Sequence, residues 1–284
     1  MKTIKQFFSA GGIQTQSRKR KRDSSDSPTV KVDETKDEPS STDSSSGSSH
    51  KEALPDGKSW IEFLQLPTEM RVDETLLDEL WELKPAKMGQ VKLFGKVVDT
   101  PRWQQNYGQD YYYSGMWHSA LPVDNAYLKR LLEWVRAHSG QPYSQILINW
   151  YAMLFGQLHC RYADGNHYIG PHSDDETQLV RNSSIYSFSF GQVVYSCYRR
   201  QERDFVVRSK KTERKYNKSF RLRNNSVLIM GGEMQKHFTH SVPKRALSKC
   251  PGKRINITFR LFKPQQQVQP AASEKKSSSD KKKE

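Results

Sequence analysis

Residues 168–176 read Tyr168-Ile169-Gly170-Pro171-His172-Ser173-Asp174-Asp175-Glu176, with an imidazole and a carboxylate two positions apart. In an extended segment alternate side chains share a face, so His172 and Asp174 can hold one metal ion while Ser173 points away. A second, distant histidine would complete a set of two histidines and one carboxylate, which leaves coordination positions open on an iron ion. The stretch therefore predicts an iron site if the rest of the chain supplies that histidine.

His240 is the candidate for this second histidine. It lies 66 residues after Asp174, in Phe238-Thr239-His240-Ser241-Val242. This separation suits a ligand that arrives from a later strand of the same barrel. The expected metal ligands are therefore His172, Asp174 and His240.

Residues 254–260 read Arg254-Ile255-Asn256-Ile257-Thr258-Phe259-Arg260 and alternate polar and apolar side chains without a break. In a strand this places both arginines on one face and the apolar side chains on the other. A buried arginine is costly unless it meets an anion, and a guanidinium binds a carboxylate through two hydrogen bonds. The strand predicts either an inward pair of arginines that binds a dicarboxylic acid, or an outward cationic stripe over an apolar core.

Positive charge is concentrated in the middle of the chain. The formal net charge is +15 over 284 residues, with a pI of 9.6. Residues 1–57 carry 10 Lys and Arg against 9 Asp and Glu, and residues 265–284 carry 5 against 3, which leaves 31 against 19 between them. A basic folded region predicts an acidic partner, with nucleic acid as the first candidate.

The cysteines and the absence of long apolar runs indicate the compartment. Cys160, Cys197 and Cys250 have no paired spacing, so they predict neither a disulfide framework nor a zinc ribbon, which favours a reducing compartment. No apolar run reaches the roughly 18 residues that cross a bilayer, and the N-terminus lacks a signal-peptide core. We expect a soluble intracellular protein, and a monomer.

Both ends of the chain are expected to be disordered. Residues 1–57 and 265–284 are dominated by Ser, Lys, Asp, Glu, Gln and Pro, and they have too few apolar side chains to offset the entropy of ordering. One folded domain is therefore expected between residues 58 and 264.

Two short segments of the N-terminal tail carry signals of their own. Ile4, Phe7 and Phe8 resemble the box by which repair proteins dock on the sliding clamp, although Met1 stands where that box has Gln. The alternative is a frayed apolar terminus. The basic run at residues 18–22 predicts nuclear import, and hence a nuclear location, rather than a merely solvated charge cluster.

Hydrophobic periodicity predicts a mainly β fold with flanking helices. A helix is expected over residues 74–83, capped by Asp73 and ended by Pro85, and a second one after Asp124. Short β-rich runs separated by turn residues predict a sandwich or jelly roll with the helices packed outside it. The second helix should bury Leu128, Leu131, Leu132 and Val135, and the expected strands cover residues 146–151, 185–190, 193–198, 205–208, 220–223, 227–230 and 255–262.

The metal ligands and the arginine strand, in this order and spacing, resemble the AlkB family of iron(II)- and 2-oxoglutarate-dependent dioxygenases over roughly residues 60–263. The sub-pattern is similar to the DNA-repair branch, in the subfamily of AlkB homologue two. The resemblance implies a double-stranded β-helix (jelly roll) in which His172, Asp174 and His240 bind Fe(II). Arg254 and Arg260 would hold 2-oxoglutarate, with Asn256 assisting, and O2 would be the other co-substrate.

The same family places an Asn-x-Tyr pair on the strand before the metal loop, where both side chains contact 2-oxoglutarate. Asn149 and Tyr151 match this pair, but the expected continuation begins only at Ala163, so residues 152–162 are interpreted as an insertion. In the alternative alignment Tyr162 takes the tyrosine position. The insertion would either impair the site or reflect a faulty gene model.

The resemblance also implies substrate contacts in the first half of the domain. Residues 91–96 resemble a hairpin that probes the DNA duplex, and Phe94 would insert between bases unless the segment is a core strand. Tyr111-Tyr112-Tyr113-Ser114-Gly115 resembles the lid of the base pocket. The implied substrate-binding residues are Phe94, Tyr111, Tyr113, Ser114, Asp175 and Glu176, the last two with the alternative of only neutralising basic neighbours.

The resulting hypothesis is a DNA repair dioxygenase that flips an N-methylated base, of the 1-methyladenine or 3-methylcytosine type, into a pocket and removes the methyl group. Flipping is required because the methyl group lies on the pairing edge, which the duplex hides. The alternatives are an RNA or single-strand demethylase of the same chemistry, a non-catalytic DNA-binding or clamp-binding module, and a zinc hydrolase, against which the paired arginines argue.

Overall fold

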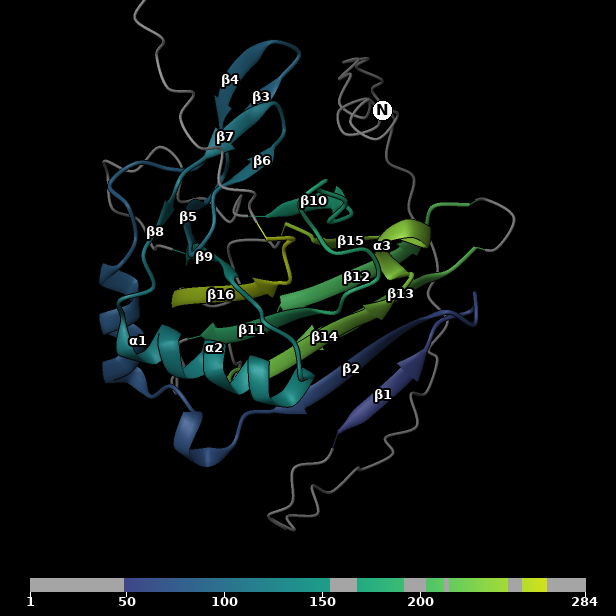
Figure 1. Ribbon diagram of the computed structural model, residues 1–284, viewed down its shortest axis with the longest axis horizontal. Helices are drawn as coiled ribbons and strands as arrows, with labels where there is room; N and C mark the ends of the chain where they lie inside the picture. Colours follow the sequence, from purple (N-terminus) through teal and green to yellow (C-terminus); the bar gives the residue numbers. More distant parts are fainter. Residues whose placement is uncertain (1–48, 154–167, 192–202, 212–214, 245–251, 265–284) are drawn as a thin grey trace, which may run out of the picture.

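The computed structural model describes residues 49–153, 168–191, 203–211, 215–244 and 252–264. Two sheets, in which most neighbouring strands are antiparallel, pack together (Figure 1). This arrangement confirms the expected double-stranded β-helix. The larger sheet has the strand order β1-β2-β14-β11-β16-β9-β5-β8, and the smaller has the order β10-β15-β12-β13. Their bounds are β1 His50–Ala53, β2 Ser59–Gln65, β5 Trp103–Tyr107, β8 Ala120–Leu121, β9 Gln145–Met153, β10 Ile169–His172, β11 Ile185–Gly191, β12 Arg203–Ser209, β13 Asn217–Leu222, β14 Ser226–Gly232, β15 Phe238–Val242 and β16 Gly252–Arg260.

The central strands of the larger sheet have two different faces. On β9 and β16 the side chains of Ile148, Trp150 and Ile257 belong to an apolar cluster that also contains the buried side chains of the helices. The alternate residues, such as Asn149 and Asn256, line a cavity between the sheets. The alternation at residues 254–260 therefore has its polar face inside, and the outward cationic stripe is wrong.

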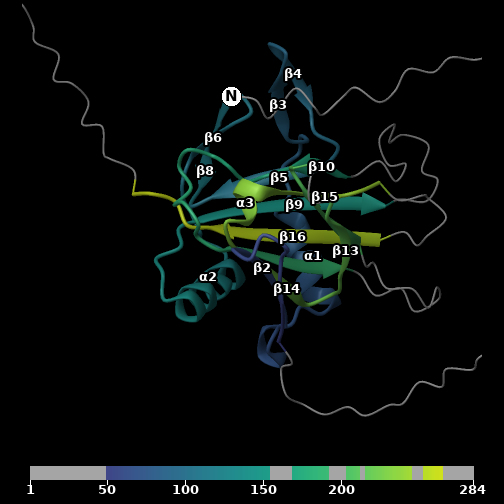
Figure 2. The same cartoon turned by 90° about the vertical axis from the view of Figure 1, so that its right-hand side faces the viewer.

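Two helices cover the apolar face of the larger sheet, where Figures 1 and 2 place them on the same side. Helix α1 spans Glu74–Glu82, and Asp73 accepts a hydrogen bond from the backbone N of Leu76 at 2.9 Å, so the expected cap is confirmed. Helix α2 spans Ala126–Ser139, after Asp124 as expected, and the side chain of Asn125 caps it. The third helix, α3 Met234–His237, is a single turn. Within the described ranges, none of the helices has the length and apolar character needed to cross a membrane.

The remaining expected strands are present, with one exception. Residues 193–198 lie outside the described residues, as do most of residues 1–57 and the C-terminal tail. Order begins earlier than expected, because β1 precedes residue 58 and pairs with β2. This edge strand is polar, and its Glu52 accepts hydrogen bonds from Lys218 Nζ at 2.7 Å and from the Tyr216 hydroxyl at 3.2 Å. These contacts stabilise a segment whose composition alone resembles a disordered tail.

Two hairpins project from the barrel on one side (Figure 1). One joins β3 Gln90–Leu93 to β4 Lys96–Asp99, and the other joins β6 Tyr111–Tyr113 to β7 Met116–His118. Each has a two-residue turn, Phe94-Gly95 and Ser114-Gly115, in which both residues have positive φ. Such turns match the twist of a hairpin. Phe94 is therefore at an exposed tip, and the alternative of a core strand is wrong.

Candidate iron and 2-oxoglutarate site

The three expected metal ligands meet on the smaller sheet. Strand β10 pairs with β15 so that His172 lies opposite His240, after a register shift between Ile169 and His172. The Nε2 of His172 lies 3.6 Å from Oδ1 of Asp174, and the ligand atoms of all three residues lie within 4.8 Å of one another. Asp174 and His240 are buried, and His172 is partly exposed. This spacing lets one small cation contact all three.

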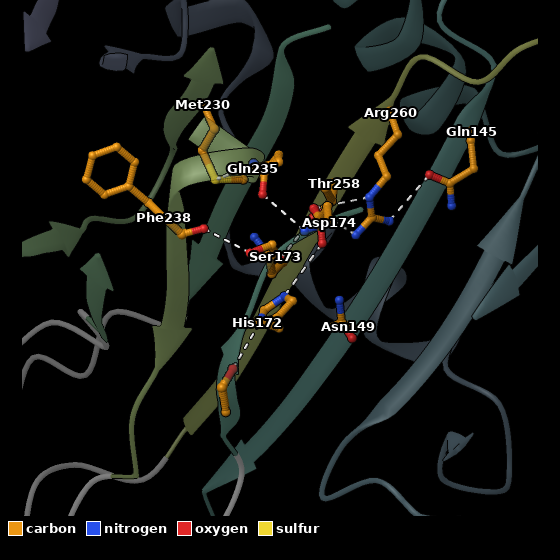
Figure 3. A network of polar contacts seen from close by, with 12 residues as sticks. Gln145, Asn149, His172, Ser173, Asp174, Met230, Gln235, Phe238, Thr258 and Arg260 are labelled. Atoms are coloured by element: carbon orange, nitrogen blue, oxygen red, sulfur yellow. Dashed lines mark hydrogen bonds and ion pairs between the residues drawn. The ribbon is translucent and has the colours of Figure 1, made fainter. Parts of the chain in front are cut away.

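The turn that carries Asp174 is fixed by hydrogen bonds to α3 and β15 (Figure 3). The backbone N of Asp174 donates to Oε1 of Gln235 at 3.0 Å, and the hydroxyl of Ser173 donates to the carbonyl of Phe238 at 2.9 Å. Nδ1 of His172 lies 2.9 Å from the carbonyl of Gly170, which leaves Nε2 for the metal. Gln235 could not be predicted from the sequence, because no spacing pattern connects it with the ligands.

Electrostatics keep the three ligands in the protonation states that a cation needs. Burial, together with the neighbouring His172, lowers the pKa of His240 to about 3, and burial also lowers the pKa of His172. Burial alone would raise the pKa of Asp174, but Arg260 and the two histidines hold it below its usual value. Two neutral imidazoles and one carboxylate result, which is the donor set that divalent iron accepts.

The two arginines of β16 lie in the same cavity but have different partners. Arg260 makes an ion pair with Asp174, with Nη2 3.1 Å from Oδ2. Nη2 of Arg254 donates to the hydroxyl of Ser189 at 3.1 Å, and its Nη1 is buried without a hydrogen-bond partner among the described residues. The expectation that one dicarboxylic acid binds to both arginines stays a prediction, and the structure shows that the two differ in their present partners. Arg260 already has an anion, and Arg254 is the arginine with a free donor.

The strands beside Arg254 supply further polar groups. In register, Asn149 lies opposite Asn256 and Tyr151 lies opposite Arg254. The Arg254 guanidinium lies 5.1 Å from the centroid of the Tyr151 ring. Burial lowers the pKa of Arg254 to about 10, so it stays protonated at neutral pH. The geometry thus brings Asn149 and Tyr151 to the site, while Tyr162 lies outside the described residues.

Asn149 and Arg260 have neighbours that the sequence analysis did not name. Nε of Arg102, in the loop between β4 and β5, donates to Oδ1 of Asn149 at 2.8 Å. Gln145 accepts from Arg260 Nη1 at 3.5 Å (Figure 3). Alternation along β9 was a sufficient signal for Gln145, because residues 145, 147, 149 and 151 share a face. No comparable signal marks Arg102 in its loop.

The cavity fits an iron ion and a dicarboxylic acid. Its lining contains the three metal ligands, Asn149, Asn256 and both arginines. The unpartnered Nη1 of Arg254 is a donor that a carboxylate would satisfy, and leaving such a group unpaired is costly. The residues present therefore suit both groups.

Aromatic residues of β6 form the mouth of the cavity. Tyr111 and Tyr113 line it with ring centroids 6.2 Å apart, and burial raises the pKa of each. Glu176 also lines it, and burial raises the pKa of its carboxyl to about 7. Asp175 is exposed and is absent from the described lining, so its expected place in the pocket is not supported. The hydroxyl of Ser114 instead donates to the carbonyl of Lys92 at 3.2 Å, which joins the two hairpins.

Comparisons with known proteins agree with this geometry. Residues 58–260 match the family model of the 2OG-Fe(II) oxygenase superfamily, whose cofactors are iron(II) and 2-oxoglutarate. The chain is 34% identical to "DNA oxidative demethylase ALKBH2" of Bos taurus over 62% of this chain and 59% of that protein. It is 35% identical to the Homo sapiens protein of the same name over 61% of each chain, and 32% identical to that of Mus musculus over 66% of this chain and 73% of that protein. The alignments thus span about three fifths of the bovine and human relatives. The chain belongs to the 2OG-Fe(II) oxygenase superfamily and, within it, to the AlkB family, where it is similar to ALKBH2.

Proposed function

We propose that this protein is a DNA repair dioxygenase that removes N-linked methyl groups, of the 1-methyladenine or 3-methylcytosine type, from DNA. One observation carries the proposal: a single cavity is lined by His172, Asp174 and His240, by Arg254 with its unpartnered donor, and by the aromatic pair Tyr111 and Tyr113. The similarity to proteins named DNA oxidative demethylases supports the same substrate class.

The chain's own residues would hold the cofactors. His172, Asp174 and His240 would bind Fe(II), and Arg254 would bind one carboxylate of 2-oxoglutarate, beside Asn149, Tyr151 and Asn256. Bound iron(II) and 2-oxoglutarate supply the chemistry: O2 and 2-oxoglutarate are consumed, succinate and carbon dioxide form, and the hydroxylated methyl group leaves as formaldehyde.

Arg260 would act mainly on Asp174. Their ion pair fixes the carboxylate that faces the two histidines, and it keeps that carboxylate ionised despite its burial. Gln145 holds the same guanidinium from the other side. Arg260 therefore orients a ligand, whereas Arg254 is suited to contact 2-oxoglutarate directly.

Tyr111 and Tyr113 would stack on the substrate base with His172 opposite. The exchange of one base for another changes such stacking little, because every base has an aromatic face. Selection then requires a polar contact, and Glu176 is the candidate because its carboxyl reaches into the cavity and, with a pKa of about 7, can donate or accept a proton. A base that enters this pocket must leave the duplex, and Phe94 at the exposed hairpin tip would fill its place.

The test is to incubate the full chain with iron(II), ascorbate and 2-oxoglutarate, and to measure succinate and formaldehyde with methylated and unmethylated oligonucleotides. We expect turnover with methylated duplex DNA and none with a His240→Ala control. Turnover only with RNA or single strands would replace the proposal by a single-strand demethylase. Oligonucleotide binding without turnover would replace it by a non-catalytic binding module.

For the N-terminal tail, which lies outside the described residues, we propose clamp docking through Ile4, Phe7 and Phe8 and nuclear import through residues 18–22. A peptide of residues 1–8 should bind a purified sliding clamp, and an alanine triple substitution of its three anchors should not. A fluorescent fusion should leave the nucleus when the basic run is replaced by glutamine. Unchanged binding or unchanged location would refute the respective assignment.

A further inference from the structure

The exposed apolar side chains of the described residues are concentrated in one stretch of the sequence, which includes the two projecting hairpins. Among the described residues, the large apolar side chains that are exposed all lie between residues 94 and 121: Phe94, Val97, Val98, Tyr112, Trp117 and Leu121. A soluble surface seldom gathers such side chains without a binding role. The proposed function uses Phe94, but it gives no role to the aromatic pair Tyr112 and Trp117, which are 45% and 66% exposed.

Tyr112 and Trp117 lie on the outer face of the hairpin whose inner face forms the mouth. They are opposite each other in the register of β6 and β7, and their rings meet edge to face with centroids 5.6 Å apart. The neighbours Tyr111 and Tyr113 point the other way, into the cavity. One short hairpin therefore presents aromatic rings on both sides.

A lysine packs against the turn of the same hairpin. Lys92 of the neighbouring hairpin is exposed, and both its backbone N and its carbonyl O bond to Ser114 at the turn of β6 and β7. The aliphatic part of Lys92 approaches Gly115, since a Cβ there would lie 3.4 Å from the Cβ of Lys92. Residues 111–118 contain no acidic side chain. Exposed aromatic rings beside a lysine are the surface on which nucleobases stack while the lysine meets a phosphate.

We propose that Tyr112 and Trp117 form a second stacking surface, which holds an unpaired nucleobase adjacent to the base in the cavity. The inference rests on the proposed function, because it takes a nucleic acid as the ligand of the cavity. The two faces of the hairpin would then contact two bases of one nucleic acid, one inside the cavity and one outside it.

The test is a binding measurement in which no turnover occurs. The full chain carrying His172→Ala is titrated into a fluorescein-labelled single-stranded oligonucleotide with one 1-methyladenine, and fluorescence anisotropy gives the Kd. Adding Trp117→Ala should weaken binding by on the order of 10-fold, as the loss of one stacked base does. Trp117→Phe should restore most of the affinity, because a phenyl ring still stacks.

Leu121→Ala is the matched control, since Leu121 is an exposed apolar residue of the neighbouring strand β8 that has no ring to stack. It should bind as the parent does. If Trp117→Ala also binds as the parent does, or if Leu121→Ala loses as much affinity as Trp117→Ala, the stacking surface is refuted. Unchanged thermal unfolding of the variants verifies that they are folded.

Tryptophan fluorescence gives a second measurement. The oligonucleotide should quench the emission of the parent more than that of the Trp117→Phe variant, because a stacked base quenches an indole. Equal quenching would contradict the proposal. Both measurements are independent of catalysis, so a protein that binds through Trp117 but does not demethylate would retain this inference and lose the proposed function.

Discussion

The interior of the cavity and the two hairpins at its mouth differ in what they bury. The interior buries charged groups: Asp174, Arg254 and Arg260 are each at most 5% exposed. The hairpins expose apolar groups, and Phe94 is 75% exposed. Both arrangements are unfavourable for folding on their own. A buried charge loses its hydration and requires a partner, and an exposed apolar side chain does not contribute the free energy that its burial would give. A ligand would offset each cost, a metal ion and a carboxylate inside and a nucleic acid outside.

The largest expected effect is on the metal ligands. His240→Ala should abolish turnover while leaving oligonucleotide binding at the hairpins intact, because His240 is a buried metal ligand on β15 that is given no contact with the base. Succinate release and anisotropy measure the two functions. Asp174→Ala should in addition lower stability by about 3–5 kcal/mol, because it leaves Arg260 buried without its anion. Retained turnover in His240→Ala would refute the metal site, and a loss of oligonucleotide binding in the same variant would show that the cavity interior and the hairpins do not act separately.

The next effect distinguishes the two arginines. Arg254→Met should weaken 2-oxoglutarate binding by about 2–5 kcal/mol, roughly 30-fold or more, since it removes a buried charge partner of the carboxylate. Calorimetric titration with Mn(II) in place of iron would measure it. Arg260→Met, the matched variant, should instead lower the melting temperature, because its guanidinium pairs with Asp174. Equal loss of 2-oxoglutarate affinity in both variants would contradict the division of roles.

Salt should affect nucleic-acid binding at the hairpins and 2-oxoglutarate binding inside the cavity differently. Between 50 and 200 mM salt, oligonucleotide affinity should fall by on the order of 10-fold or more, because phosphate contacts release counterions. Affinity for 2-oxoglutarate should change much less, since Arg254 is buried and poorly screened. Titrations of both ligands at the two salt concentrations give the comparison. A parallel fall would mean that the 2-oxoglutarate donor is open to solvent.

Phe94→Ala should reduce turnover on methylated duplex by roughly 5- to 10-fold, the cost of one lost stacking contact, and should affect single strands much less. The reason is that only a duplex has a place in the stack to be filled. The measurement is kcat/KM on both substrates. Val98→Ala, an exposed neighbour away from the hairpin tip, is the control. Equal losses on the two substrates would assign Phe94 a general binding role instead.

The smallest effect on activity is expected outside both regions. Asp73→Ala removes the cap of α1 and should lower the free energy of unfolding by about 1 kcal/mol, with kcat/KM unchanged. Urea unfolding measures the first quantity. Asp73→Asn, which still caps a helix, should be nearly neutral. A change in turnover would mean that α1 positions the cavity more directly than its packing indicates.

Much of this fold and site could be predicted because simple periodicities mark them. Alternation at residues 254–260 indicated the polar face of β16, and helical spacing indicated the buried stripe of α2. The ion pair of Arg260 with Asp174 could not be predicted, because ion pairs depend on distances between strands far apart in the chain. Order also begins earlier than the composition predicts, since β1 is polar and is held by Glu52 contacts with β13 and the residue before it.

The sequence alone identified the three candidate metal ligands, the two arginines on one strand face and, through the family resemblance, the jelly-roll class, because these depend on residue type, spacing and local period. Only the tertiary structure decided which arginine keeps a free donor, that Gln235 and Arg102 support the site, and that Asp175 is exposed while Glu176 lines the cavity. The physical reason is that a side chain's environment is set by the strands packed around it. Neighbours in sequence such as Asp175 and Glu176, or Tyr111 and Tyr112, can therefore face opposite surroundings.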